Sequence, residues 1–188
     1  MSAPSAFQTC LQGGILLEVA ADDMNVLTSS SHGKHAIGTQ ALNGCTCVVI
    51  LGETAILLAH IQPYDGAFEQ DTQRDIPKES HDHHEHALAA IAQAVRQHSD
   101  RFLAASTAWG IFACCKEDGF VQSIFRQVQS HLQAMGYNMR PVLYDEKPFL
   151  EIVPPKGEVI AYFNSSDEAE LWLEGGRLWP STQDYSER

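Results

Sequence analysis

Two apolar runs joined by a short turn dominate the first third of this chain. Residues 45–51 read CTCVVIL and residues 54–61 read TAILLAHI, with a Gly-Glu pair between them. Apolar runs of this length that contain β-branched residues are typical of buried strands, and a two-residue turn between them favours an antiparallel hairpin. The sequence therefore predicts a central hairpin, with Cys45 at the start of one strand and His60 near the end of the other.

The rest of the chain mixes strand-like and helix-like patterns. Apolar residues at steps of three and four indicate two main helices, and short apolar runs indicate further strands. The predicted elements are strands at 15–20, 25–30, 109–115, 141–144, 149–153 and 159–163, and helices at 83–97, 120–135 and 167–174. This order favours an α+β fold, in which a mixed β-sheet or β-sandwich carries the two main helices on one face.

Length and composition indicate one domain. The chain has 188 residues and 44% hydrophobic content, which suits a single well-buried core. We expect one domain over residues 1–176, followed by a polar and mobile tail at residues 177–188.

Charge and cysteine usage narrow the class of protein. The chain carries 24 acidic and 12 basic residues, a net charge of −12, so we expect no nucleic-acid partner. No run approaches the roughly 20 apolar residues of a membrane helix, and no signal peptide is recognisable. The cysteines number five and include two closely spaced pairs, which do not resemble a disulfide framework. We expect a cytoplasmic protein with reduced thiols and no membrane association.

A hairpin of this kind brings the Cys45 thiol and the His60 imidazole together, although they are fifteen residues apart in sequence. Nucleophilic cysteine chemistry uses such a pair, because a nearby imidazole keeps the thiol deprotonated and later moves a proton. We expect a shared, solvent-accessible pocket and a lowered pKa of the Cys45 thiol. The alternative is that both residues are structural, since cysteines in apolar strands commonly pack in the core.

The residues around Cys45 suggest how an oxyanion could be held. Asn43 and Gly44 readily adopt positive φ, so the backbone can turn sharply before the thiol and direct the N–H groups between Gly44 and Thr46 at a carbonyl oxygen. Cys47 points to the same sheet face as Cys45 but lies deeper in the run. We interpret Cys47 as a core residue and as the second candidate for the nucleophile.

These residues resemble a known family. The stretch TQALNGC at 39–45, followed by an apolar strand, a short turn and AILLAHIQP, is similar to the chemoreceptor glutamine deamidases, the CheD family. In that family a threonine six residues before the catalytic cysteine, a glycine-bearing turn and a histidine after a hairpin form the active site. Thr39, Cys45 and His60 fall at the matching positions. The resemblance covers about two thirds of the chain and implies α/β/β layers.

The resemblance also implies a reaction. A glutamine side chain of a protein substrate would be hydrolysed to glutamate through a thioester on Cys45, without a cofactor. His60 would protonate the departing ammonia and then activate water, and Thr39 would orient the His60 ring.

The chain departs from the family in three ways, and these departures leave alternatives open. The family usually has Gly-Ser-Cys or Gly-Thr-Cys where this chain has Asn-Gly-Cys, the hairpin is about two residues shorter, and an acidic, histidine-rich segment is inserted. Choosing Cys47 as the nucleophile restores a Cys-Thr-Cys triplet but loses the register of the threonine. The alternatives are a non-catalytic binding module on the same fold and a thiol hydrolase of another amide or ester.

The inserted segment reads ESHDHHEHA. Its histidines are weak candidates for zinc, copper or nickel ligands, and they are His81, His83, His84 and His86. No spaced partner motif completes a metal site. We therefore expect no metal and interpret the segment as a solvated acidic loop whose histidines titrate near pH 6.5, with a metal-dependent hydrolase as the third-ranked function.

Overall fold

The computed structural model describes residues 4–31, 33–42, 44–63, 76–103, 106–114, 120–145 and 157–180. Its elements are α1 (Ala6–Gln12), β1 (Leu16–Glu18), β2 (Asp23–Thr28), β3 (Ala36–Thr39), β4 (Thr46–Leu51), β5 (Ala55–Ile61), α2 (Ile76–Gln97), β6 (Thr107–Cys114), α3 (Phe120–Ala134), β7 (Met139–Asp145), β8 (Val159–Phe163), β9 (Ala169–Leu173) and β10 (Gly176–Trp179). None of these helices has the length and apolarity required to cross a membrane.

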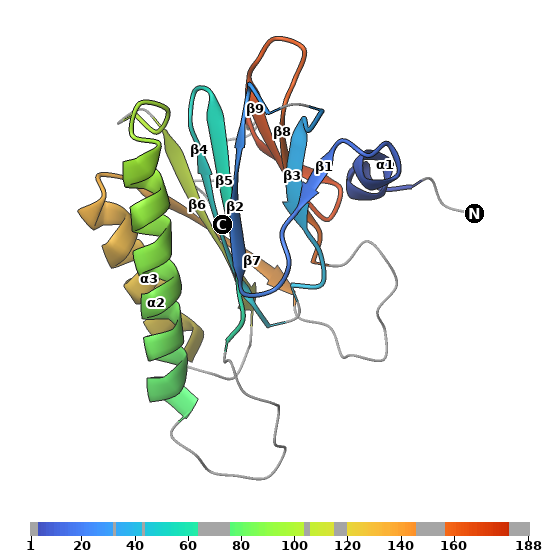
Figure 1. The fold of residues 1–188 in the computed structure, drawn as a ribbon. Coiled ribbons are helices and arrows are strands. Elements are labelled where there is room, and N and C mark those ends of the chain that lie inside the picture. Colours follow the sequence, from blue (N-terminus) through green and yellow to red (C-terminus); the bar gives the residue numbers. More distant parts are fainter. Residues whose placement is uncertain are drawn as a thin grey trace.

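The strands form two five-stranded sheets that face each other (Figure 1). Sheet A has the order β1-β3-β8-β9-β10, and sheet B has the order β2-β5-β4-β6-β7. Among the described pairs, β1 with β3 and β6 with β7 run parallel, and the others run antiparallel. Helix α3 provides the crossover between β6 and β7 that a parallel pair requires. Both sheets are therefore mixed.

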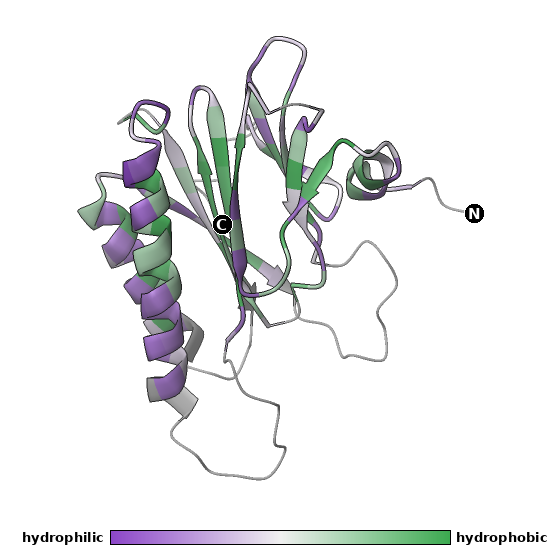
Figure 2. Cartoon of the chain, in the orientation of Figure 1, coloured by the Kyte–Doolittle hydropathy of each residue, from purple (hydrophilic) through white to green (hydrophobic). Residues whose placement is uncertain are grey.

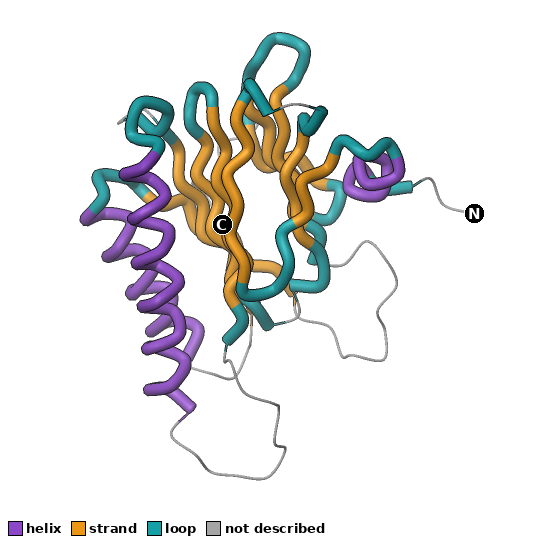
Figure 3. Tube along the Cα trace, in the orientation of Figure 1, coloured by secondary structure: helices purple, strands orange, loops and turns teal. Residues whose placement is uncertain are grey.

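The layers follow the predicted arrangement. Helices α2 and α3 cover the outer face of sheet B, and the short helix α1 lies beyond sheet A on the opposite side of the molecule (Figure 3). The sequence did not predict α1, which packs its buried Phe7 against Leu16 and Ile160. The predicted α+β class, with a β-sandwich and two main helices on one face, is confirmed.

Two apolar layers flank sheet B. Residues Cys47, Val49 and Leu51 of β4 face sheet A, whereas Val48 and Ile50 face the helices. Figure 2 shows the resulting apolar strands at the centre and a helix α2 that is hydrophilic toward solvent. Because β4 and β5 are buried on both faces, their sequences are almost continuously apolar.

The predicted central hairpin is confirmed. β4 and β5 pair antiparallel, with Cys47 opposite His60 and Thr46 opposite Ile61. The Gly52 N–H donates to the Ala55 carbonyl at 2.8 Å and closes the turn. β4 lies between β5 and β6, and β5 lies between β2 and β4, so both strands are central.

Two predictions in the middle and last parts of the chain were wrong. The histidine-rich segment is not a loop, because α2 begins at Ile76 and includes it. The segment 167–174 is not a helix, because Ala169–Leu173 pairs with β8 on one side and β10 on the other. These strand pairings supply the hydrogen bonds that a helix would have made internally.

The first residues of the expected mobile tail form a strand. Gly176–Trp179 is an edge strand, and its backbone pairs with β9. Three parts of the predictions lie outside the described residues: tail residues 181–188, the predicted strand at 149–153, and Asn43.

Candidate functional site

A hydrogen bond between Thr39 and His60 joins the two sheets. Thr39 is the last residue of β3 in sheet A, and His60 lies near the end of β5 in sheet B. Thr39 Oγ1 and His60 Nδ1 are 2.7 Å apart, and the two residues are 1% and 3% exposed. The structure therefore places Thr39 against the imidazole, at the position that the sequence hypothesis requires.

The other ring nitrogen of His60 has no such partner. His60 Nε2 is buried, and no atom of the described residues forms a hydrogen bond with it, so neither thiol is hydrogen-bonded to Nε2 in this conformation. Burial lowers the pKa of His60 below 6.5, although the negative charge of Asp22 acts to raise it. The ring is therefore neutral at neutral pH. If Nδ1–H donates to Thr39 Oγ1, Nε2 carries the lone pair of a general base.

The Cys45 and Cys47 thiols both lie on the face of the hairpin that packs against sheet A. Cys47 lies directly opposite His60, and Cys45 lies two residues earlier, on the diagonal from the ring. Burial is the main cause that raises the pKa of the fully buried Cys47 thiol, and the nearby Cys45 raises it further. A thiolate is therefore disfavoured at Cys47. This supports the interpretation of Cys47 as a core residue and leaves Cys45 as the candidate nucleophile.

The site is closed. Cys45 is 6% exposed and His60 is 3% exposed, so the expectation of a solvent-accessible pocket was wrong for this conformation. The reason is that sheet A covers the face of the hairpin that carries both side chains.

A tight turn leads into Cys45. The Cys45 N–H donates to the Leu42 carbonyl at 3.0 Å, and Gly44 has φ +76°, as the sequence predicts. Because that N–H is already used, it cannot also hold an oxyanion while the turn is closed. The Thr46 side chain faces the helices, with its Oγ1 3.2 Å from His84 Nε2.

Tyr144 holds the same turn from strand β7. Its single hydroxyl hydrogen is shared between the carbonyl oxygens of Leu42 and of Cys45, the latter at 2.8 Å. Tyr144 is itself buried. No motif in the sequence points to this tyrosine, because the contact joins segments about a hundred residues apart.

Replacing Tyr144 with Phe is expected to lower the free energy of unfolding by about 1–3 kcal/mol, since it removes the hydroxyl hydrogen that two buried carbonyls share. Amide hydrogen exchange at Cys45 should also become faster, because the turn loses its support. Tyr137→Phe is the matched control: its hydroxyl donates to Phe102 at 3.2 Å, and its loss should leave exchange at Cys45 unchanged. Unchanged exchange at Cys45 in Tyr144→Phe would contradict this role.

The histidines of α2 have separate partners. Their contacts are His81 Nδ1 with Gln127 Oε1 (2.7 Å), His83 Nε2 with Asp22 Oδ1 (2.8 Å), His84 Nδ1 with the Ser80 carbonyl (2.8 Å) and His86 Nδ1 with the Asp82 carbonyl (2.8 Å). Across the part of the chain that the structure describes, no three His, Cys, Asp or Glu side chains are arranged to hold a metal ion.

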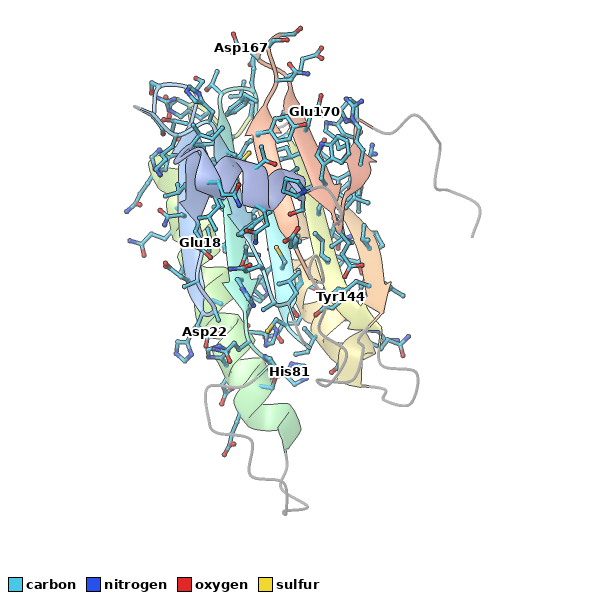
Figure 4. All side chains as sticks on the ribbon, turned by 90° about the vertical axis from the view of Figure 1, so that its right-hand side faces the viewer. Glu18, Asp22, His81, Tyr144, Asp167 and Glu170 are labelled. Atoms are coloured by element: carbon cyan, nitrogen blue, oxygen red, sulfur yellow. The ribbon has the colours of Figure 1, made fainter. Side chains whose placement is uncertain are left out.

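These contacts gather at one end of the sandwich. Asp22, His81 and Tyr144 lie toward the end of the molecule where α2 begins (Figure 4). Asp167 and Glu170 lie at the opposite end. Because His84 contacts Thr46, the residue next to Cys45, the histidine-rich part of α2 adjoins the candidate site.

No protein-family model matches the sequence, and no curated protein is similar to it. Among solved structures, the fold is similar to the C-terminal domain of CNFy from Yersinia pseudotuberculosis, with 11% identity and a TM-score of 0.37. The similarity covers 83% of this chain and 54% of that one, so this chain spans about half the length of that protein chain. A likeness at this level carries no inference about function.

Proposed function

We propose that this protein is a cysteine-dependent amidohydrolase that deamidates glutamine side chains of a protein substrate. The observation that carries the proposal is the Thr39–His60 hydrogen bond, which holds the ring at Nδ1 and leaves Nε2 available at the end of the hairpin that carries Cys45. A ring oriented in this way can take a proton from a thiol. The CheD-like spacing of the three residues supports glutamine as the substrate group.

In the proposed reaction, Cys45 Sγ attacks the glutamine Cδ while His60 Nε2 takes the thiol proton. The imidazolium then returns this proton to the departing nitrogen, ammonia leaves, and a thioester remains. Nε2 next takes a proton from water, which attacks the thioester, and the proton passes to the Cys45 sulfur as glutamate is released. Thr39 keeps the His60 ring oriented in both the acylation and the deacylation step.

Burial adds a step to this scheme. With Cys45 at 6% exposure, a glutamine side chain reaches the sulfur only after the covering residues move apart. The same movement would release the Cys45 N–H from Leu42 and allow the N–H groups from Gly44 to Thr46 to face the oxyanion. Opening therefore precedes acylation.

Ammonia release from glutamine-containing proteins tests the proposal. Wild-type protein and Cys47→Ala should release ammonia, whereas Cys45→Ala should not. If Cys47→Ala loses activity and Cys45→Ala keeps it, the nucleophile is Cys47 rather than Cys45. Unchanged release in Cys45→Ala would contradict a cysteine mechanism at this site.

The burial of the site favours a second candidate, a non-catalytic binding module. In that case Cys45 and Cys47 are core thiols, and the Thr39–His60 bond serves only to join the sheets. This candidate predicts no ammonia release and no Cys45-dependent hydrolysis of other amides or esters. Hydrolysis of another amide or ester that depends on Cys45 would instead identify a different thiol hydrolase.

A further inference from the structure

The histidine segment of α2, residues 80–84, contacts the open end of the hairpin, through His84 at Thr46 and through Ser80 at Pro63. The proposed chemistry does not use these histidines. Their contacts nevertheless reach both strand ends that carry the site residues, one through His84 and the other through His83.

His84 holds the strand of Cys45. It is 1% exposed, and both of its ring nitrogens have partners: the Ser80 carbonyl at Nδ1 and Thr46 Oγ1 at Nε2. A carbonyl only accepts, so Nδ1 carries the hydrogen, and in the neutral ring Nε2 accepts from the Thr46 hydroxyl. Burial is the main cause that lowers the pKa of His84 to about 4, so the ring is neutral.

His83 holds the strand of His60. Its Nε2 is 2.8 Å from Asp22 Oδ1. The same carboxylate accepts from the backbone N–H of Gln62 at 2.8 Å and from Gln62 Nε2 at 2.9 Å. Ser80 also donates through its hydroxyl to the Pro63 carbonyl. The chain just beyond His60 is thus tied to the helix by two residues.

We propose that the histidine segment positions the site, with His84 fixing Thr46 and through it the thiol of Cys45. This inference rests on the proposed function. The side chains of Thr46 and Cys45 leave one strand on opposite faces, so an anchor on the helix side can fix the sulfur without contacting a substrate. His84 is a positioning residue, and the pair of His83 and Asp22 does the same for the end of β5.

The test is the rate at which iodoacetamide alkylates Cys45, measured peptide by peptide with mass spectrometry. Thr46→Val keeps the shape of the side chain and removes the hydroxyl, and Thr46→Ser keeps the hydroxyl. The rate at Cys45 should fall at least about tenfold in Thr46→Val and His84→Ala, because small displacements of a reactive group are costly. Thr46→Ser should recover most of the wild-type rate.

Cys47 and His86 provide the controls. A general loosening of the fold would raise the alkylation rates at both Cys45 and Cys47, and this result would overturn the proposal, as would wild-type rates in Thr46→Val and His84→Ala. His86→Ala should react like wild type, since the His86 Nδ1 bond is to the Asp82 carbonyl of the same helix and does not reach the hairpin.

The proposed function and this inference can fail separately. Ammonia release that survives Thr46→Val undiminished would refute the positioning role and leave the hydrolase intact. A wild-type protein that releases no ammonia, but whose Cys45 rate still depends on the Thr46 hydroxyl, would refute the hydrolase and support the positioning role.

Discussion

Ammonia release is expected to fall about 100- to 10,000-fold when His60 is replaced by Ala, because the reaction loses its general acid and base. Thr39→Val should cost roughly tenfold to a hundredfold, since the ring keeps its chemistry but loses the partner that orients it. Thr39→Ser retains the hydroxyl that bonds Nδ1 and is the matched control, with most of the activity preserved. Initial rates at saturating substrate separate these effects from weaker binding.

The pH dependence of the same activity gives a second readout. The base form of His60 is required, and burial places its pKa below 6.5, so the acid limb of kcat/KM should lie below pH 6.5. Thr39→Val should shift the acid limb. If Thr39 had only a structural role, the variant would leave the acid limb at its wild-type pH. A His60→Ala variant as active as wild type would remove His60 from the mechanism.

The free energy of unfolding is expected to fall by about 3 kcal/mol between pH 6.5 and pH 4 through His84 alone. The unfolded chain takes up the His84 proton near pH 6.5, whereas the folded protein resists it until about pH 4. Because folding lowers the pKa of His84, the stability that the neutral ring contributes is fully present above pH 6.5 and is lost as the pH falls toward 4. His60 acts in the same direction.

Urea unfolding of wild type and His84→Gln at neutral pH and at pH 4 measures this contribution. Carboxylates titrate in both proteins, so the difference between them isolates His84. That difference should shrink by about 3 kcal/mol at the lower pH. The groups that act on His84 are Ser80, His83, His81 and Asp22, and they remain in the variant. A difference that does not change with pH would contradict a buried neutral His84.

The sequence predicted the elements whose patterns are local. The hairpin follows from two apolar runs, and α3 follows from its apolar spacing and from Gly136, whose φ of +91° ends the helix. β9 was missed because AELWL between polar residues also suits a helix. Pairing with β8 makes this segment a strand. Its side chains alternate as in any strand, because Leu171 faces the core between the sheets and Trp172 packs on the opposite face.

The candidate site was partly predictable for the same reason. Strand pairing alone brings the ends of the hairpin together, so the neighbourhood of His60 and Cys45 could be inferred from the sequence. The support from Tyr144, His84 and Asp22 could not, because each contact joins distant segments. The burial of the site was also missed, since it depends on sheet A, whose later strands come more than a hundred residues after Cys45.

The pH dependence of Cys45 alkylation in wild type and His60→Ala tests the central claim most directly. Cys10 is partly exposed, with a pKa raised by burial, and serves as the internal reference in every sample. If His60 activates the thiol, Cys45 reacts faster than Cys10 near neutral pH despite its burial, and His60→Ala removes this advantage. If Cys45 reacts more slowly than Cys10 and at the same rate in both proteins, His60 does not activate Cys45, and the proposed hydrolase is wrong.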